Sequence, residues 1–142
     1  MINKIDKVKI FDLQIITSKG SKINVFENLN QLFTIKRIFT VEMNNFELNE
    51  RGRHAHKIDH QIVTCPFGSI EFEVNDGENK KKFIINNPSK AVYVPNQIWT
   101  ETNYLQKKSV VICYCSENYN EDSYIRDYND FLFYRQNLKL IN

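Results

Sequence analysis

The sequence predicts an all-β sandwich or barrel followed by a short helical segment. Short apolar runs recur along the chain with turn residues between them, and several runs alternate apolar and polar residues. Near the end the apolar spacing changes to the helical period. The 142 residues suit one domain with a real core. We therefore expect a single domain over residues 1–142.

Composition excludes several classes of protein. Charged residues make up 25% and hydrophobic ones 42%, with a net charge of +2. So balanced a charge predicts no basic face for nucleic acid. No apolar run approaches the roughly 20 residues that span a bilayer, and the N-terminus lacks the apolar stretch of a signal peptide. We expect a cytoplasmic protein that binds neither nucleic acid nor membrane.

The first half of the chain contains candidate strands bounded by turn or loop residues, at 11–17, 23–27, 34–43 and 54–65. The turn at Lys19-Gly20 makes the first two strands a hairpin. The third strand places Ile35, Arg37, Phe39 and Val41 on one face. A polar loop covers 44–50, and Pro66-Phe67-Gly68 ends the fourth strand.

The second half continues the pattern, with candidate strands at 69–74, 82–86, 91–94, 99–102 and 109–115. Ile70, Phe72 and Val74 share one face, and Asn75-Asp76-Gly77 is a strong hairpin signal. Over 122–140 the apolar residues follow helical spacing, which predicts a short helix or two packed on the barrel.

The three cysteines, Cys65, Cys113 and Cys115, do not form a disulfide framework. Cys113 and Cys115 lie in an apolar run that predicts a buried strand. A Cys-x-Cys pair can bind metal, but no second pair completes a site. We expect small, reduced core residues.

Two of the three histidines, His54 and His56, are one residue apart. In a strand, residues i and i+2 point to the same face, so both imidazoles should project side by side. Imidazole moves protons near neutral pH and is also the commonest metal ligand. The pair is therefore a candidate for either role, or for plain hydrogen-bonded core residues.

The spacing around the pair is similar to the metal-binding frame of the cupins, with two replacements. Gln61 stands where that frame has Glu, and Thr100 stands where its second motif has His. Two imidazoles, an amide and a hydroxyl make a poor ligand set, even though His60 is a possible third ligand. We expect no metal and no other cofactor.

Without a metal, two adjacent imidazoles make each other harder to ionise, so one should be neutral near pH 7 and act as a base. Such a pair suits proton abstraction beside a carbonyl. Arg51, Arg53 and Lys57 bracket the pair. Arg53 and Lys57 should face away from it in a regular strand, whereas the turn at Gly52 leaves Arg51 open.

The chain resembles the nucleotide-sugar 3,4-ketoisomerases over roughly residues 8–134. The resemblance rests on Ile35-Lys36-Arg37, on Arg51-Gly52 with His54-Ala55-His56-Lys57, on Gln61, and on the run Tyr124-Ile125-Arg126-Asp127-Tyr128. Asn75-Asp76-Gly77 and Trp99 add weaker matches.

This resemblance implies a metal-free cupin-type barrel (a jelly roll) and a homodimer that exchanges N-terminal strands. The implied reaction moves the keto group of thymidine-diphosphate (dTDP) 4-keto-6-deoxyglucose from C4 to C3 through an enediol, toward dTDP-3-amino-3,6-dideoxyhexoses.

We expect His54 to be the main base and His56 its partner. Arginine forks suit a diphosphate and an aromatic slot suits thymine; the expected substrate-binding residues are Arg37, Arg51, Lys57, Gln61, Trp99 and Thr100, with Lys36 a further candidate.

Three positions depart from the family pattern. Phe39 and Thr40 replace tyrosines near the site, which removes a hydroxyl suited to moving a proton between O3 and O4, and Thr100 replaces His or Arg. The product's configuration at C4, galacto or gluco, therefore stays open. A dTDP-4-keto-sugar 3,5-epimerase and a non-catalytic nucleotide-sugar-binding cupin are the alternative functions.

Overall fold

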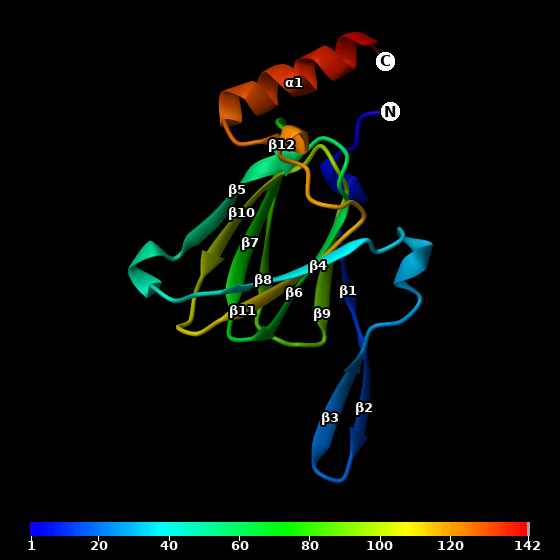
Figure 1. Cartoon of the computed structure of the whole chain (residues 1–142), viewed down its shortest axis with the longest axis vertical. Helices are drawn as coiled ribbons and strands as arrows, with labels where there is room; N and C mark the ends of the chain where they lie inside the picture. The colour runs from blue at the N-terminus through cyan, green and yellow to red at the C-terminus, as the bar shows by residue number, and fades with distance from the viewer. Residues whose placement is uncertain (142) are drawn as a thin grey trace.

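The computed structural model describes residues 1–141 and contains two five-stranded antiparallel sheets, a separate two-stranded hairpin and a C-terminal helix (Figure 1). The elements are β1 Lys9–Asp12, β2 Gln14–Ser18, β3 Ser21–Val25, β4 Arg37–Glu42, β5 Glu50–His56, β6 Gln61–Phe67, β7 Ile70–Asn75, β8 Lys80–Ile85, β9 Lys90–Val94, β10 Trp99–Tyr104, β11 Val110–Cys115, β12 Tyr124–Ile125 and α1 Tyr128–Ile141. Short 3-10 turns lie at Ile5–Lys7, Leu29–Gln31, Phe46–Leu48 and Glu121–Ser123. The predicted all-β class with a C-terminal helix is confirmed.

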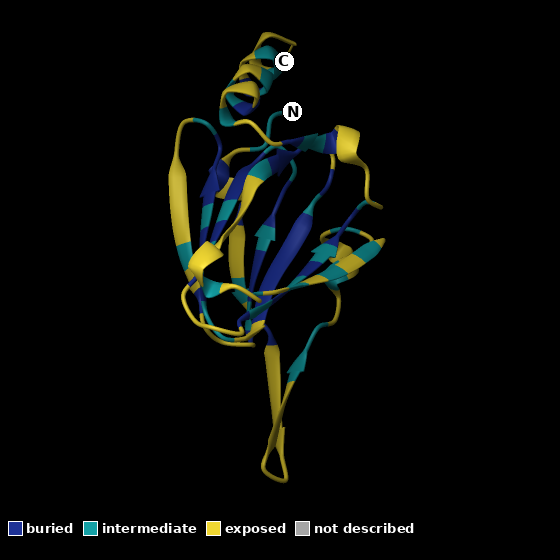
Figure 2. Cartoon of the chain, turned by 60° about the vertical axis from the view of Figure 1, so that its left-hand side comes forward, coloured by how far each residue is buried: buried dark blue, intermediate teal, exposed yellow. Residues whose placement is uncertain are grey.

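The two large sheets have the orders β1-β9-β6-β11-β4 and β12-β5-β10-β7-β8. Their facing sides form the core, drawn dark blue in Figure 2. The predicted alternation in β7 is confirmed, because Ile70, Phe72 and Val74 are buried whereas Glu71 and Glu73 are half-buried. Side chains fill part of the space between the two sheets. The rest is a cavity beside β4 and β5, where polar residues interrupt the apolar lining.

The hairpin predicted at Asn75-Asp76-Gly77 joins β7 to β8. The Asn75 side-chain oxygen accepts from the Gly77 N–H at 2.7 Å, and Asp76 accepts from the N–H groups of Glu78 and Asn79. Asp76 also accepts from the N–H of Ile5, so this turn anchors the start of the chain.

The prediction of one continuous strand over 54–65 is wrong. β5 ends at His56 and β6 begins at Gln61, and the two strands belong to different sheets. The chain turns between them because Asp59 is drawn inward: its buried carboxylate accepts from the Ser116 hydroxyl and the Glu117 N–H. A buried carboxylate needs such partners, which apolar periodicity does not reveal.

The strand predicted at 11–17 is two strands, β1 and β2, divided at Leu13. The Leu13 side chain is buried and its N–H donates to the Ser89 carbonyl at 2.6 Å, so β1 joins the large sheet beside β9. β2 and β3 form the predicted hairpin, which projects away from the two sheets (Figure 1).

The C-terminal helix begins later than the apolar spacing predicts. Tyr124 and Ile125 pair with β5 as β12, and the helix starts at Tyr128, where Asp127 accepts from the N–H groups of Asn129 and Asp130. Phe131 is fully buried against Trp99, which fixes the helix on the end of the barrel. Within residues 1–141 no helix combines the length and apolar character that crossing a membrane requires.

Cys65, Cys113 and Cys115 are free and buried, as predicted. Burial raises the pKa of the Cys65 and Cys115 thiols to about 11 and raises that of Cys113 as well. All three therefore stay protonated near neutral pH and act as small core side chains.

Candidate active site

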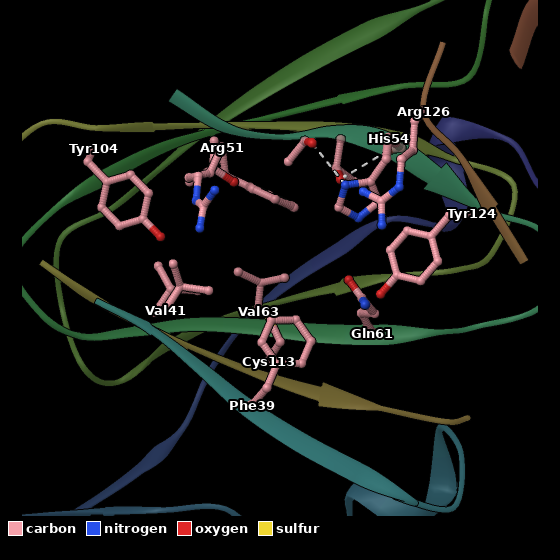
Figure 3. A pocket seen from close by; sticks show the side chains of 15 residues that line it. Phe39, Val41, Arg51, His54, Gln61, Val63, Tyr104, Cys113, Tyr124 and Arg126 are labelled. Atoms are coloured by element: carbon pink, nitrogen blue, oxygen red, sulfur yellow. Dashed lines mark hydrogen bonds between the residues drawn. The ribbon is translucent and has the colours of Figure 1, made fainter. Parts of the chain in front are cut away.

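A cavity of about 270 Å³ opens between the two sheets, and its wall is apolar along β4, β11 and Val63 of β6 and polar near β5, β12 and Gln61 (Figure 3). Its lining residues are Phe39, Val41, Arg51, Gly52, His54, Gln61, Val63, Phe72, Thr100, Thr102, Tyr104, Val111, Cys113, Tyr124 and Arg126. Sheet pairing brings these together from distant parts of the chain.

His54 and His56 project from the same face of β5, as predicted. Their Nε2 atoms lie 3.1 Å apart, and the rings meet edge to face with centroids 4.8 Å apart. His54 lines the cavity, whereas His56 lies behind it and is only 5% exposed. The pair therefore forms one unit that reaches from the cavity into the protein interior.

A β-bulge ahead of the pair decides where the neighbouring arginines point. Glu101 pairs with Gly52 and Thr100 with His54, so Arg53 is an extra residue on β5. Gly52 and Arg53 both have positive φ, and a Cβ on Gly52 would lie 3.1 Å from the Thr100 carbonyl oxygen. The bulge turns Arg51 into the cavity lining and leaves Arg53 exposed beside Glu50. The sequence left the direction of the Arg51 side chain undecided, and the bulge is what decides it.

The His54 ring has a defined tautomer. Its Nδ1 lies 2.9 Å from the Gly52 carbonyl oxygen, which can only accept a hydrogen bond. Nδ1 therefore carries the proton in the neutral ring, and Nε2 keeps its lone pair. This is the arrangement a general base requires.

Burial lowers the pKa of both imidazoles. Desolvation is the main cause for His54, partly opposed by its bond to the Gly52 carbonyl. For His56 desolvation comes first and the His54 and Arg37 charges add to it, which lowers the pKa to about 3. The prediction that a neutral base is present near pH 7 agrees with these directions.

These shifts predict where activity falls on the acid side. A base whose pKa lies below the ordinary 6.5 is more than half unprotonated at pH 6.5, so we expect the acid limb of kcat/KM to be centred below pH 6.5. The pH profile of kcat/KM measures this, with His60→Asn as a control because the His60 ring bonds Tyr93, which does not line the cavity. An acid limb centred at or above pH 6.5 in the unaltered protein would contradict the assignment of a desolvated base.

The predicted site residues divide into two groups. His54, Arg51, Gln61 and Thr100 line the cavity, with His56 behind them. Gln61 reaches the pair directly, since its side-chain nitrogen lies 3.2 Å from Nε2 of His56.

The other predicted residues have different contacts. Arg37 bonds Asp59 at 3.0 Å, and Lys57 donates to the Asp122 carbonyl, two residues ahead of β12. Trp99 is buried against the helix and donates to Glu101, and Lys36 pairs with Glu117. None of these four is among the cavity-lining residues.

Two cavity residues, Tyr124 and Arg126, received no role from the sequence. The Tyr124 ring lies 4.3 Å from the His56 ring and 5.2 Å from the His54 ring, because β12 pairs Tyr124 with His56. The Arg126 guanidinium covers the Tyr124 ring at 4.4 Å and forms two bonds to Glu121. The i, i+2 spacing of Tyr124 and Arg126 could have indicated a strand with both side chains on one face. The apolar residues around them follow helical spacing, which favoured a helix instead.

Metal binding requires a donor set that the described residues do not assemble. Within residues 1–141 no group of three or more His, Cys, Asp or Glu side chains is placed to hold an ion. His60 bonds Tyr93 and does not line the cavity, so it does not join His54 and His56 as a ligand.

A two-sheet jelly roll with a histidine pair beside its cavity defines a cupin-type barrel. The chain belongs to the family described as "FdtA: WxcM-like, C-terminal", whose model matches residues 6–136. It is 32% identical over 140 residues to the TDP-4-oxo-6-deoxy-alpha-D-glucose-3,4-oxoisomerase of Aneurinibacillus thermoaerophilus, covering 99% of this chain and 97% of that one.

Solved structures agree with this assignment. A 3,4-ketoisomerase from Helicobacter canadensis is 31% identical with a TM-score of 0.85, covering 92% of this chain and 98% of that one. QdtA, a sugar 3,4-ketoisomerase from Thermoanaerobacterium thermosaccharolyticum in complex with TDP, is 25% identical with a TM-score of 0.86, covering 94% and 98%.

Proposed function

We propose that this protein is a metal-independent 3,4-ketoisomerase of dTDP-4-keto-6-deoxyglucose. The observation that carries the proposal is the pair of buried imidazoles at the cavity, with His54 holding its Nε2 lone pair free of the Gly52 bond. The oxoisomerase to which the chain is 32% identical is named for this same sugar, which supports the substrate.

In the proposed reaction, Nε2 of His54 takes the proton from C3 of the sugar, and the C–H electron pair becomes the C3–C4 double bond of an enediol. The C4 carbonyl π pair moves onto O4, which gains the proton that O3 loses. The protonated histidine pair then returns a proton to C4, which leaves the ketone at C3 and a hydroxyl at C4. Atoms and charges balance without a redox partner. A general base of this kind contributes roughly 10²–10⁴-fold to the rate.

The transfer of a proton from O3 to O4 needs a group that both donates and accepts a proton. Phe39 lines the cavity and Thr40 is exposed, so neither supplies the expected tyrosine hydroxyl. The Tyr124 ring contacts both histidine rings, and its hydroxyl points into the cavity (Figure 3). We assign this oxygen-to-oxygen transfer to Tyr124.

The size of the cavity indicates which part of the substrate it holds. At about 270 Å³ it is smaller than most small-molecule pockets, which run roughly 300–1,000 Å³. It therefore suits the hexose ring, with the nucleoside diphosphate near the open side. Arg51 and Arg126 line the cavity and are exposed, and guanidinium groups suit bidentate binding of a diphosphate.

Product analysis tests the proposal directly. Incubation with dTDP-4-keto-6-deoxyglucose in D₂O, followed by NMR, is expected to show a new ketone at C3, and the C4 signal reports its configuration. Deuterium appearing at C5, without a ketone at C3, would instead identify a 3,5-epimerase. Binding of dTDP without any turnover would identify a binding module.

The projecting hairpin supports a homodimer. Ile15, Ile16 and Ile23 are 46%, 44% and 51% exposed, and β2 and β3 pair only with each other among the strands of residues 1–141. We propose that a second copy covers this hairpin by exchange of N-terminal strands. Light scattering is expected to give a dimer for the unaltered protein and a monomer for Ile15→Lys/Ile23→Lys; a monomeric unaltered protein would contradict it.

The proposal places the enzyme in the cytoplasm. Three reduced, buried thiols suit a reducing compartment.

A further inference from the structure

Asp59 forms a buried polar centre directly behind the histidine pair. It is 3% exposed, lies in the turn between β5 and β6, and does not line the cavity. Four groups donate to its carboxylate: the Arg37 guanidinium at 3.0 Å, the Glu117 N–H at 3.0 Å, the Ser116 hydroxyl at 3.2 Å and the Gln61 amide at 3.3 Å. So complete a set of donors holds the carboxylate in one position.

This carboxylate determines which way the Gln61 amide points. Oδ2 of Asp59 can only accept, so the Gln61 atom facing it must be the NH₂ nitrogen and not the carbonyl oxygen. The same nitrogen lies 3.2 Å from Nε2 of His56 and donates to it. Nε2 of His56 therefore carries a lone pair, and the proton of the neutral ring is on Nδ1.

The other side of the His56 ring leads to the same tautomer. Its Nδ1 is buried, has no hydrogen-bond partner among the described residues, and lies 3.9 Å from Oδ2 of Asp59. A lone pair aimed at a carboxylate in this dry environment is unfavourable, whereas an N–H aimed at it is attracted. Asp59 thus acts on His56 directly at Nδ1 and through Gln61 at Nε2.

We propose that Asp59 is a positioning residue that holds His56 in its Nδ1–H tautomer, so that Nε2 of His56 keeps a lone pair that can accept a proton from His54. A proton that His54 takes from the sugar is then shared with Nε2 of His56 across 3.1 Å. The tautomer stands on the geometry alone, and only this proton sharing rests on the proposed function. Arg37 consequently serves as the counter-charge of Asp59 and not as a ligand of the diphosphate.

NMR of protein labelled with ¹⁵N-histidine tests the tautomer without substrate, and the chain has only three histidines to assign. At pH 7.5, long-range ¹H–¹⁵N correlations are expected to show His56 with its proton on Nδ1. In Asp59→Asn the side-chain amide can donate to Nδ1, so the His56 proton is expected to move to Nε2. We expect kcat of this variant to fall roughly tenfold or more, with KM changed less than about twofold.

Two further variants separate positioning from general damage. Ser116→Ala removes a hydrogen bond to the same carboxylate but keeps its charge, so the His56 tautomer should not change. If Asp59→Asn leaves Arg37 unpaired and fails to fold, Arg37→Gln/Asp59→Asn removes both charges and should show the same movement of the proton. An unaltered protein with the His56 proton on Nε2, or either Asp59→Asn variant with the proton still on Nδ1, would overturn the proposal.

Discussion

Replacing His54 with asparagine is expected to lower kcat at least 100-fold, the scale for loss of a general base. An asparagine side chain can still donate to the Gly52 carbonyl, but it has no lone pair of suitable basicity to take the C3 proton. Its shorter, polar side chain at the cavity wall leaves the core between the sheets intact, so the loss should fall on kcat. NMR of the sugar during turnover measures the rate.

The third histidine supplies the matched control for this experiment. His60 bonds the Tyr93 hydroxyl and does not line the cavity, so His60→Asn should keep nearly full activity. Near-full activity in His54→Asn would remove His54 from the role of base, and equal losses in both variants would point to damage of the fold.

The largest effect on stability is expected from Gly68→Ala, at the turn between β6 and β7. Gly68 has φ of +88°, and an added Cβ would lie 2.6 Å from the Ser109 Cα, a backbone atom that cannot rotate away. Left-handed strain and overpacking together should lower the free energy of unfolding by about 3 kcal/mol. The midpoint of urea denaturation measures this loss.

Gly20 provides a comparison with the same backbone strain but no crowding. Its φ is +78°, and an added Cβ would meet no atom within 4 Å. Gly20→Ala should therefore lower the free energy of unfolding by only about 1–2 kcal/mol. Equal losses in the two variants would show that the close approach to Ser109 contributes nothing.

Local patterns predicted much of this structure. The period of two placed His54 and His56 on one face, alternation predicted the buried side of β7, and Asn75-Asp76-Gly77 predicted the hairpin that follows it. These features depend on residues close in sequence, where backbone geometry alone decides which side chains share a face.

The features that the sequence did not reveal depend on contacts between distant segments. Asp59 breaks the predicted strand because Ser116 and Glu117 bond it from 57 and 58 residues away. Arg37 faces inward as predicted, yet this carboxylate binds it outside the cavity wall. Tyr124 reaches the histidines only because β12 adds to the edge of β5, a pairing that no local pattern indicates.

The fate of the C3 hydrogen tests the central claim most directly. The substrate is labelled with deuterium at C3 and followed by NMR with the unaltered protein and with His54→Asn. We predict that the unaltered protein removes the label from C3 as the ketone moves there, that C5 keeps its hydrogen, and that His54→Asn slows this removal at least 100-fold. Retention of deuterium at C3 during turnover, with exchange at C5 instead, would contradict the account.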